Sequence, residues 1–379
     1  MPLVSVIIPT YNRDYLIGES IQSVLDQTFP DFELFVIDDG STDHTSEVVR
    51  SFSDSRLKYI LQENRGPAAA RNMGLKAAHS EFITFLDSDD LFIKNKINRQ
   101  LTFLKQSPEI GLCFTAYTKI IEFGTIDPIT HGRRTDPVVL EELLMGPAFT
   151  FSSVMLRKGW VDQVGLLDET LSTGEEWQWL IRIILVGCQM AGLTEPLVVK
   201  RIHSQNLIRF PERNEVSGIK AINSVFNLPD FPSELQCLYP VAMANHFARL
   251  SGLACINNDI DQSALFASKA LQELEHFSDQ EKDDIAMKIV HIARGLSIND
   301  PREMLFDLSD HLTAKRGDLA MFSKALRAAW YATETYDCFC TQNRSGVINN
   351  SLHYLMVTFP RPKNRGVSSM LLRSLVGEF

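Results

Sequence analysis

Short apolar runs alternate with amphipathic segments along the first hundred residues. Val4 to Ile8 is apolar on both faces and rich in β-branched residues, which is typical of a buried parallel strand. From Leu16 to Leu25, apolar residues recur at helical spacing and form one stripe. The same alternation continues and predicts strands at residues 4–8, 32–37, 57–61 and 81–86, with helices at 16–25, 43–52 and 68–78 between them.

Alternating strands and helices of these lengths predict right-handed crossover units on a parallel sheet. In such sheets, ligands bind beyond the carboxyl ends of the strands. Those ends carry polar residues at Pro9 to Arg13, Asp38 to Asp43 and Asp87 to Asp90. We therefore expect three polar clusters to lie along one edge of the sheet.

The second half of the chain has a different pattern. Strands are predicted at 111–117, 152–156 and 197–202, with a helix at 175–186, but residues 235–345 are rich in Ala, Leu, Lys and Glu and predict several helices. A four-residue repeat, found at Ser268 to Leu271 and again at Ser323 to Leu326, suggests two helical hairpins of a solenoid-like domain. We expect an α/β domain over residues 1–215 and an all-α domain over residues 216–379.

Composition narrows the class of protein. The 379 residues exceed the size of a usual single domain, and 45% hydrophobic with 22% charged residues is ordinary for a soluble globular protein. A net charge of −10 argues against nucleic-acid binding. The N-terminus lacks a signal-peptide pattern, no apolar run is long enough to cross a membrane, and the six cysteines are scattered. We expect a cytoplasmic protein with reduced thiols.

Two acidic clusters are candidates for binding chemistry. Asp87-Ser88-Asp89 ends an apolar strand, and carboxylates two apart can flank one hard cation such as Mg²⁺ or Mn²⁺. A carboxylate of Asp38 to Asp43 can accept hydrogen bonds from a base or ribose. Both clusters have an alternative interpretation as ordinary solvated turns with helix caps.

Other polar residues also have two interpretations. Arg71 can meet a phosphate or pair with a nearby aspartate. Glu175 and Glu176 open a predicted helix, where acids are stabilised by the helix dipole. His203 follows a predicted strand, and a single histidine is more often packed than a ligand.

Taken together, four segments resemble the family 2 glycosyltransferases, which have the GT-A fold. They stand here in the family's order and spacing, over roughly residues 1–210. The segments are VSVIIPTYN from Val4, VIDDGSTD from Val36, NRGPAAARNMG from Asn64 and FLDSDD from Phe85. The resemblance implies a Rossmann-like, mostly parallel sheet flanked by helices, followed here by an all-α domain of no family that we recognise.

The resemblance also implies roles for the nucleotide site. The loop with Pro9 and Tyr11 would pack against the base, and Asp39 would accept from its imide N–H. Arg71 would lie near the base and the diphosphate. Asp87 would line the ribose and metal site, and Asp89 would bind Mn²⁺ or Mg²⁺.

Two further roles follow from the resemblance. The family usually opens a later helix with Glu-Asp, whose second acid is the catalytic base; that position is Glu176 here, and Glu175 is the fallback. Glutamate adds one methylene and moves the carboxylate by about an ångström. A histidine after the later strand often completes the metal site, and His203 fits.

We therefore predict an inverting transferase that uses a nucleotide-sugar donor, with UDP favoured, and an acceptor hydroxyl in polysaccharide, glycolipid or glycoprotein glycan synthesis. A non-catalytic nucleotide-sugar-binding scaffold, whose helical half mediates interactions, is the alternative. A dinucleotide-dependent oxidoreductase is disfavoured because no G-x-G-x-x-G follows an early strand. A nucleotidyltransferase on a similar sheet stays open.

Three roles stay open for the C-terminal half: acceptor specificity, homodimerisation and attachment to a complex. Its tail carries Arg361, Lys363, Arg365 and Arg373. Such a tail can touch the anionic inner face of a membrane, where lipid-linked acceptors are found, at only ~1 kcal/mol per cation. An ordinary solvated terminus is the interpretation that we favour.

Overall fold

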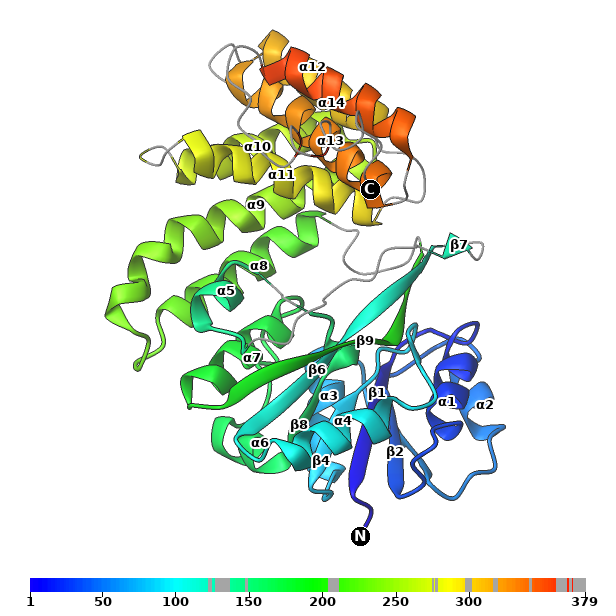
Figure 1. Cartoon of the computed structure of the whole chain (residues 1–379). Helices are drawn as coiled ribbons and strands as arrows, with labels where there is room; N and C mark the ends of the chain where they lie inside the picture. Colours follow the sequence, from blue (N-terminus) through cyan, green and yellow to red (C-terminus); the bar gives the residue numbers. More distant parts are fainter. Residues whose placement is uncertain are drawn as a thin grey trace. The chain divides into compact units, whose positions relative to one another are not determined.

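The computed structural model describes residues 1–121, 125–126, 137–146, 149–203, 211–274, 276, 279–296, 302–315, 320–340, 343–358, 367 and 370. The chain forms two compact units (Figure 1). The first unit consists of Met1–Ser204 and Val216–Tyr239, and the second of Gln205–Glu215 and Pro240–Phe379.

The first unit is built on one sheet, to which the described residues contribute nine strands in the order β3-β2-β1-β4-β8-β6-β9-β5, with β7 paired to β6. The strands are β1 (Val4–Thr10), β2 (Phe32–Asp38), β3 (Leu57–Leu61), β4 (Phe82–Phe85), β5 (Leu91–Phe92), β6 (Ile110–Ile121), β7 (Thr125–Ile126), β8 (Met155–Arg157) and β9 (Gln189–Ile202).

Strand directions bring the predicted site residues to one edge of this sheet. β1 pairs in parallel with β2 and with β4, so the segments after Thr10, Asp38 and Phe85 leave the same edge. β8 is antiparallel to both β4 and β6, and β9 is parallel to β6. β9 therefore runs in the direction of β4, and His203 emerges at the edge that carries Asp87 and Asp89.

Helices cover both faces of the sheet (Figure 1). Val4, Val6 and Ile8 of β1 belong to a core with residues of α1 (Ile17–Leu25), α2 (Thr45–Arg50) and α4 (Lys96–Gln106). On the other face, α3 (Pro67–Ala77) packs so closely on β1 that a Cβ on Gly74 would lie 2.5 Å from Ile7 Cγ2.

The fold class and most predicted elements are confirmed. Two predicted strands differ in extent: residues 151–153 form a short 3₁₀ helix, η1 (Phe151–Ser153), so β8 begins only at Met155, and β9 begins at Gln189. Ser152 and Ser153 leave the strand because both are fully buried and use their hydroxyls as hydrogen-bond partners.

Three further helices complete the first unit, namely α5 (Leu140–Leu144), α6 (Lys158–Val164) and α7 (Glu175–Leu185). α8 (Pro211–Phe226) runs through the predicted boundary at residue 215, and its later residues group with the sheet. Ser217 Oγ accepts from the backbone N–H groups of Ser172 and Thr173, at 3.1 and 2.9 Å. α8 therefore holds the segment that leads into α7.

The second unit is helical, as predicted. η3 (Ser233–Leu238) still belongs to the first unit. The second unit contains α9 (Tyr239–Ile256) from Pro240 onward, α10 (Ile260–Glu273), α11 (Asp279–Leu296), α12 (Arg302–Lys315), α13 (Ala320–Cys340) and α14 (Arg344–Thr358). The two copies of the four-residue repeat lie in α10 and α13. Hydrogen bonds between buried serines join α9 to α10 and α12 to α13. None of the helices that the structure describes could cross a membrane. The basic tail lies outside the described residues.

Candidate active site

The loops after β1 and β2 are joined by hydrogen bonds at the sheet edge. Asn12 has a left-handed φ of 51° and accepts from the Thr42 backbone N–H at 2.8 Å. Its own N–H donates to Ser41 Oγ at 2.9 Å, and the Asp39 N–H donates to the Thr10 carbonyl at 2.9 Å. The predicted Pro9–Arg13 and Asp38–Asp43 clusters therefore form one rigid rim.

Within this rim, Asp39 is buried and Tyr11 is exposed. Asp39 Oδ1 accepts from Gln62 Nε2 and the Arg65 N–H, while its Oδ2 accepts from the Gly66 N–H at 2.8 Å. Oδ2 thus has further capacity for the imide N–H of a base. Tyr11 is 44% exposed, as a stacking platform requires. Pro9 lies within β1, opposite Ile37 of β2.

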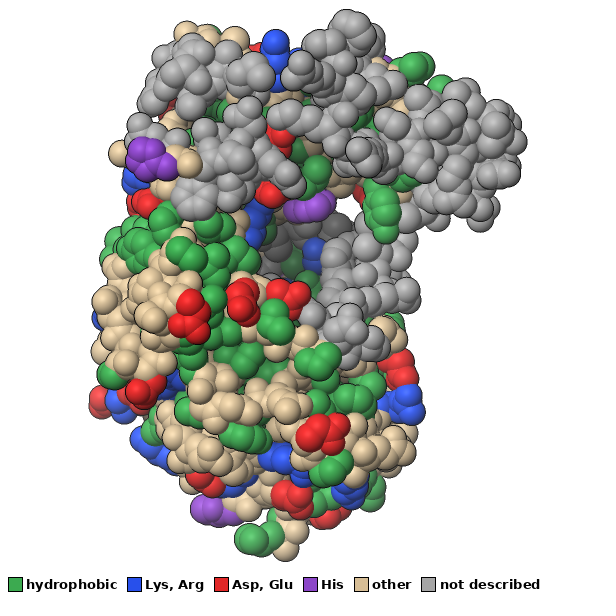
Figure 2. Space-filling model, turned by 60° about the vertical axis from the view of Figure 1, so that its left-hand side comes forward, with side chains coloured by type: hydrophobic (Ala, Val, Ile, Leu, Met, Phe, Trp, Pro, Cys, Tyr) green, Lys and Arg blue, Asp and Glu red, His purple; other side chains and the backbone are tan. Residues whose placement is uncertain are grey.

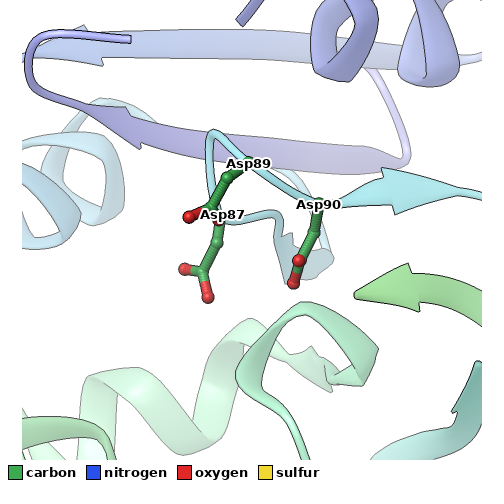
Figure 3. Close-up of side chains that lie close together, drawn as sticks. All are labelled: Asp87, Asp89 and Asp90. Carbon is green, nitrogen blue, oxygen red and sulfur yellow. The ribbon is translucent and has the colours of Figure 1, made fainter. Parts of the chain in front are cut away.

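A group of three carboxylates lies on the loop between β4 and β5 (Figure 3). Asp87, Asp89 and Asp90 each offer an oxygen within 4.8 Å of the others, an arrangement that can hold a metal ion. The space-filling view shows acidic side chains gathered among hydrophobic ones on one face of the molecule (Figure 2).

Asp89 and His203 have the geometry of two ligands to one ion. His203 Nε2 lies 3.0 Å from Asp89 Oδ2. Neighbouring ligands of an octahedral ion with bonds of about 2.1 Å are about 3 Å apart, so the pair fits Mg²⁺ or Mn²⁺. Burial alone would raise the pKa of Asp89, but the hydrogen bond and charge of His203 outweigh it and hold this pKa below its usual value.

Asp90 also supports the loop through hydrogen bonds to two other elements. Its Oδ2 accepts from Ser152 Oγ at 2.7 Å, and its Oδ1 accepts from the Arg201 backbone N–H at 3.1 Å. Burial and the neighbouring Asp89 raise the pKa of Asp90 to about 8. Asp90 therefore fastens η1 and β9 to the metal loop, a role that the sequence analysis did not assign.

Arg71 joins the metal loop to the predicted base. Its buried guanidinium donates from Nη2 to Asp87 Oδ1 at 2.8 Å and from Nη1 to Glu175 Oε1 at 3.0 Å. Nη2 also forms an ion pair with Glu176 Oε1. Four residues predicted separately thus meet in one network.

The electrostatics of this network favour a base of unusual strength at position 176. Burial raises the pKa of Glu176 to about 8, because the charge of Arg71 only partly offsets burial and the repulsion from Asp87 and Glu175. Burial also raises the pKa of Glu175. Glu175 is 5% exposed, whereas the Glu176 side chain is 31% exposed, so Glu176 is the acid that an acceptor can reach.

Lys200 and Arg201 belong to the site although the sequence analysis did not single them out. The charge of Lys200 acts on Asp90, Asp87 and Asp89, and burial, which would lower the pKa of Lys200, is outweighed by these acids. Arg201 Nη1 pairs with Glu19 Oε2 at 2.5 Å. The sequence signal was two adjacent cations at the end of the apolar run Leu197–Val199, two residues before His203.

Comparison with known proteins places this site in a family. The sequence model of glycosyl transferase family 2 matches residues 5–163. A putative teichuronic acid biosynthesis glycosyltransferase, TuaG of Bacillus subtilis, is 31% identical over 211 residues, which are 54% of this chain and 81% of that protein. The chain belongs to glycosyl transferase family 2.

Two other family relatives match over less of their length. An uncharacterized glycosyltransferase of Rickettsia felis is 37% identical over 228 residues, 60% of this chain; the chain thus spans 37% of that relative's length. WfgD of Escherichia coli, a UDP-Glc:alpha-D-GlcNAc-diphosphoundecaprenol beta-1,3-glucosyltransferase, is 50% identical over 103 residues, 27% of this chain and 41% of WfgD.

Solved structures confirm the GT-A fold class of this family 2 chain. S. aureus TarS 1-349 in complex with UDP-GlcNAc has a TM-score of 0.53 at 20% identity and covers 79% of this chain and 90% of that chain. The mannosyltransferase PcManGT from Pyrobaculum calidifontis, in complex with GDP-Man and Mn²⁺, has a TM-score of 0.51 at 20% identity and covers 77% of this chain and 86% of that chain.

Proposed function

We propose that this chain is a metal-dependent, inverting glycosyltransferase that moves a sugar from a nucleoside-diphosphate sugar to an acceptor hydroxyl. The observation that carries the proposal is the Arg71 network. Through it the metal-side Asp87 and the predicted base Glu176 are held by one guanidinium. A donor diphosphate and an attacking hydroxyl can therefore meet at one carbon between them.

The residues divide the reaction into donor binding and proton transfer. Tyr11 and Asp39 bind the base, and Asp87 lines the ribose. Glu176 takes the proton from the acceptor hydroxyl, whose oxygen attacks the anomeric carbon as the nucleoside diphosphate leaves from the opposite face. The ion held by Asp89 and His203 would neutralise charge on the leaving diphosphate.

We infer a UDP-sugar as the donor and a sugar on a lipid diphosphate as the acceptor. WfgD, by its name, takes UDP-glucose and an acceptor carried on diphosphoundecaprenol. TuaG is named as a putative glycosyltransferase of teichuronic acid biosynthesis. Contact of the chain with a membrane and homodimerisation through the helical unit remain predictions.

Glu176→Gln tests the proposal. The amide keeps the size of the side chain and cannot accept a proton, so we expect transfer to fall by ~10²–10⁴ while donor binding stays intact. Sugar transfer from UDP-sugars with Mn²⁺ and donor affinity by calorimetry measure the two effects. Near-normal turnover in Glu176→Gln would show that the base is another group, and the matched Glu175→Gln would then identify the fallback.

Donor hydrolysis in the absence of acceptor distinguishes an enzyme from a non-catalytic scaffold. An enzyme with this site should hydrolyse its donor slowly in the absence of acceptor and release a nucleoside diphosphate. Tight donor binding without any release would favour the non-catalytic interpretation. Release of pyrophosphate instead would identify a nucleotidyltransferase.

A further inference from the structure

Arg71 is committed to carboxylates of the protein on both of its terminal nitrogens. Its side chain is 5% exposed and comes from the second turn of α3. The three partners are Asp87 on the metal loop and the adjacent acids Glu175 and Glu176 at the start of α7. Asp87 and the two glutamates, which are 88 and 89 positions further along the chain, therefore depend on one guanidinium for their arrangement.

The planar guanidinium group determines how the three carboxylates are oriented. Nη1 donates to Glu175, whereas Nη2 donates to Asp87 and forms an ion pair with Glu176. A planar fork orients carboxylates more strictly than the point charge of a lysine would. The Arg71 face lies 5.3 Å from the Phe151 ring centroid, which fixes its plane. The Glu176 carboxylate is thus held in one orientation.

The length of the side chain at 176 matters for this contact. Aspartate is one methylene shorter, which draws the carboxylate back by about 1.5 Å along the chain. An ion pair at contact distance would then become a separated one.

We propose that Arg71 is a positioning residue for the base of the transfer: it orients the Glu176 carboxylate and stabilises its ionised form. This inference rests on the proposed function, because it treats Glu176 as the base. Arg71 then acts on the acceptor side of the reaction, through Glu176, in addition to any contact that it makes with the donor.

Four charged side chains act on the Glu176 carboxylate in the described structure. Arg71 from α3 and Lys200 from β9 favour the ionised carboxylate, whereas Asp87 from the metal loop and Glu175 from α7 oppose it. Arg71 is the cation in direct contact. Removing it leaves two acids and one more distant lysine around the Glu176 carboxylate, so the proton should be bound more tightly.

The test is a titration of the glutamate carboxyls by ¹³C NMR in protein with labelled glutamate, metal-free and with Mg²⁺, in which Glu176→Gln assigns the signal. Arg71→Met should move the Glu176 midpoint upward by about 1–3 pH units. Arg71→Lys should bring the Glu176 midpoint most of the way back to its wild-type value. As a control, Arg99→Met removes a surface arginine paired with Glu195, and it should leave the Glu176 midpoint unchanged. An unmoved midpoint in Arg71→Met would overturn the proposal.

Kinetics separate this proposal from the proposed function. In Arg71→Met, kcat should fall more than donor KM rises, and the acidic limb of the rate profile should move with the NMR midpoint. Should Arg71→Met not fold, Glu176→Asp on intact Arg71, titrated in protein with labelled aspartate, should lose the contact and show the same rise of the midpoint; a wild-type midpoint there overturns the idea. Unimpaired turnover in Glu176→Gln would show that the base is another group, whereas absence of transfer from any nucleotide sugar in the wild-type protein would refute the proposed function; in either case the NMR result decides the electrostatic role.

Discussion

Lys96 lies behind the candidate active site and is 0% exposed. Its Nζ donates to Thr84 Oγ1 at 2.9 Å and to Gln100 Oε1 at 2.7 Å, and it lies 4.0 Å from the Phe92 ring centroid. Burial lowers the pKa of Lys96 from 10.5 to about 7. Thr84 and Gln100 in turn bond the backbone of Val154 and Ser153, beside the metal loop.

This lysine predicts a pH dependence of stability. Between pH 7 and 10.5 the unfolded chain keeps the proton that folded Lys96 has lost. The unfolded state thus binds more protons, and the unfolding free energy should rise with pH across this window by up to about 1.4 kcal/mol per unit. Lys96→Met should remove that slope. Denaturant melts of both proteins from pH 6.5 to 9 measure it, and parallel curves would contradict the assignment.

At the scale of elements, the packing of α3 on β1 places Arg71. Alanine favours a helix over glycine by about 1 kcal/mol, but a Cβ at Gly74 would lie 2.5 Å from buried Ile7. Overpacking of this kind costs about 1–3 kcal/mol. After the gain in helix propensity is subtracted, we expect Gly74→Ala to lower the unfolding free energy by up to about 2 kcal/mol.

Gly159→Ala in α6 is the matched control for this prediction. No atom lies within 4 Å of its added Cβ in the described part of the chain. Its stability should be unchanged or raised by up to about 1 kcal/mol. Equal stability of the two variants by chemical denaturation would show that α3 does not depend on the close approach to β1.

Elements formed by local patterns could be predicted, and those fixed by distant partners could not. β1, β2 and β4 are buried, largely apolar runs between turn residues, so their pattern alone locates them. The short helix at Phe151–Ser153 could not be predicted, because Ser152 and Ser153 are defined by bonds to Asp90 and Thr150. The length of β9 depends likewise on its pairing with β6.

The candidate site shows the same division. Asp87, Asp89 and His203 follow strand ends, so topology places them at one edge. The contact of Arg71 with Glu176 spans more than 100 residues and depends on side-chain reach, which no periodicity encodes. Lys200 and Asp90 were missed for the same reason, since only the folded sheet brings them together.

At the scale of the whole molecule, α8 decides where the sheet unit ends. Ser217 bonds Ser172 and Thr173, and Lys220 Nζ donates to the Thr170 carbonyl at 3.0 Å. These bonds support the segment that places Glu175 and Glu176. The residues that follow α8, up to Tyr239, belong to the same unit.

Two fragments test this boundary. A fragment of residues 1–239 should fold and bind a nucleoside diphosphate with Mn²⁺, because it keeps the α8 contacts. A fragment of residues 1–215 should lose that binding. Thermal shifts with and without UDP and Mn²⁺ measure it, since a ligand at a hundredfold excess over its Kd adds ~2.7 kcal/mol. Equal shifts for both fragments would mean that α8 is dispensable for the site.

The central claim is that a diphosphate-bound cation and an opposing glutamate share one edge of the sheet. The most direct measurement is anomalous diffraction at the manganese edge from crystals of the chain with UDP and Mn²⁺. We predict one manganese peak bonded to Asp89 and His203, with the diphosphate on the ion, the base beside Asp39 and the Glu176 carboxylate across the open side. Manganese bound elsewhere, or UDP in a pocket that excludes Glu176, would contradict the account.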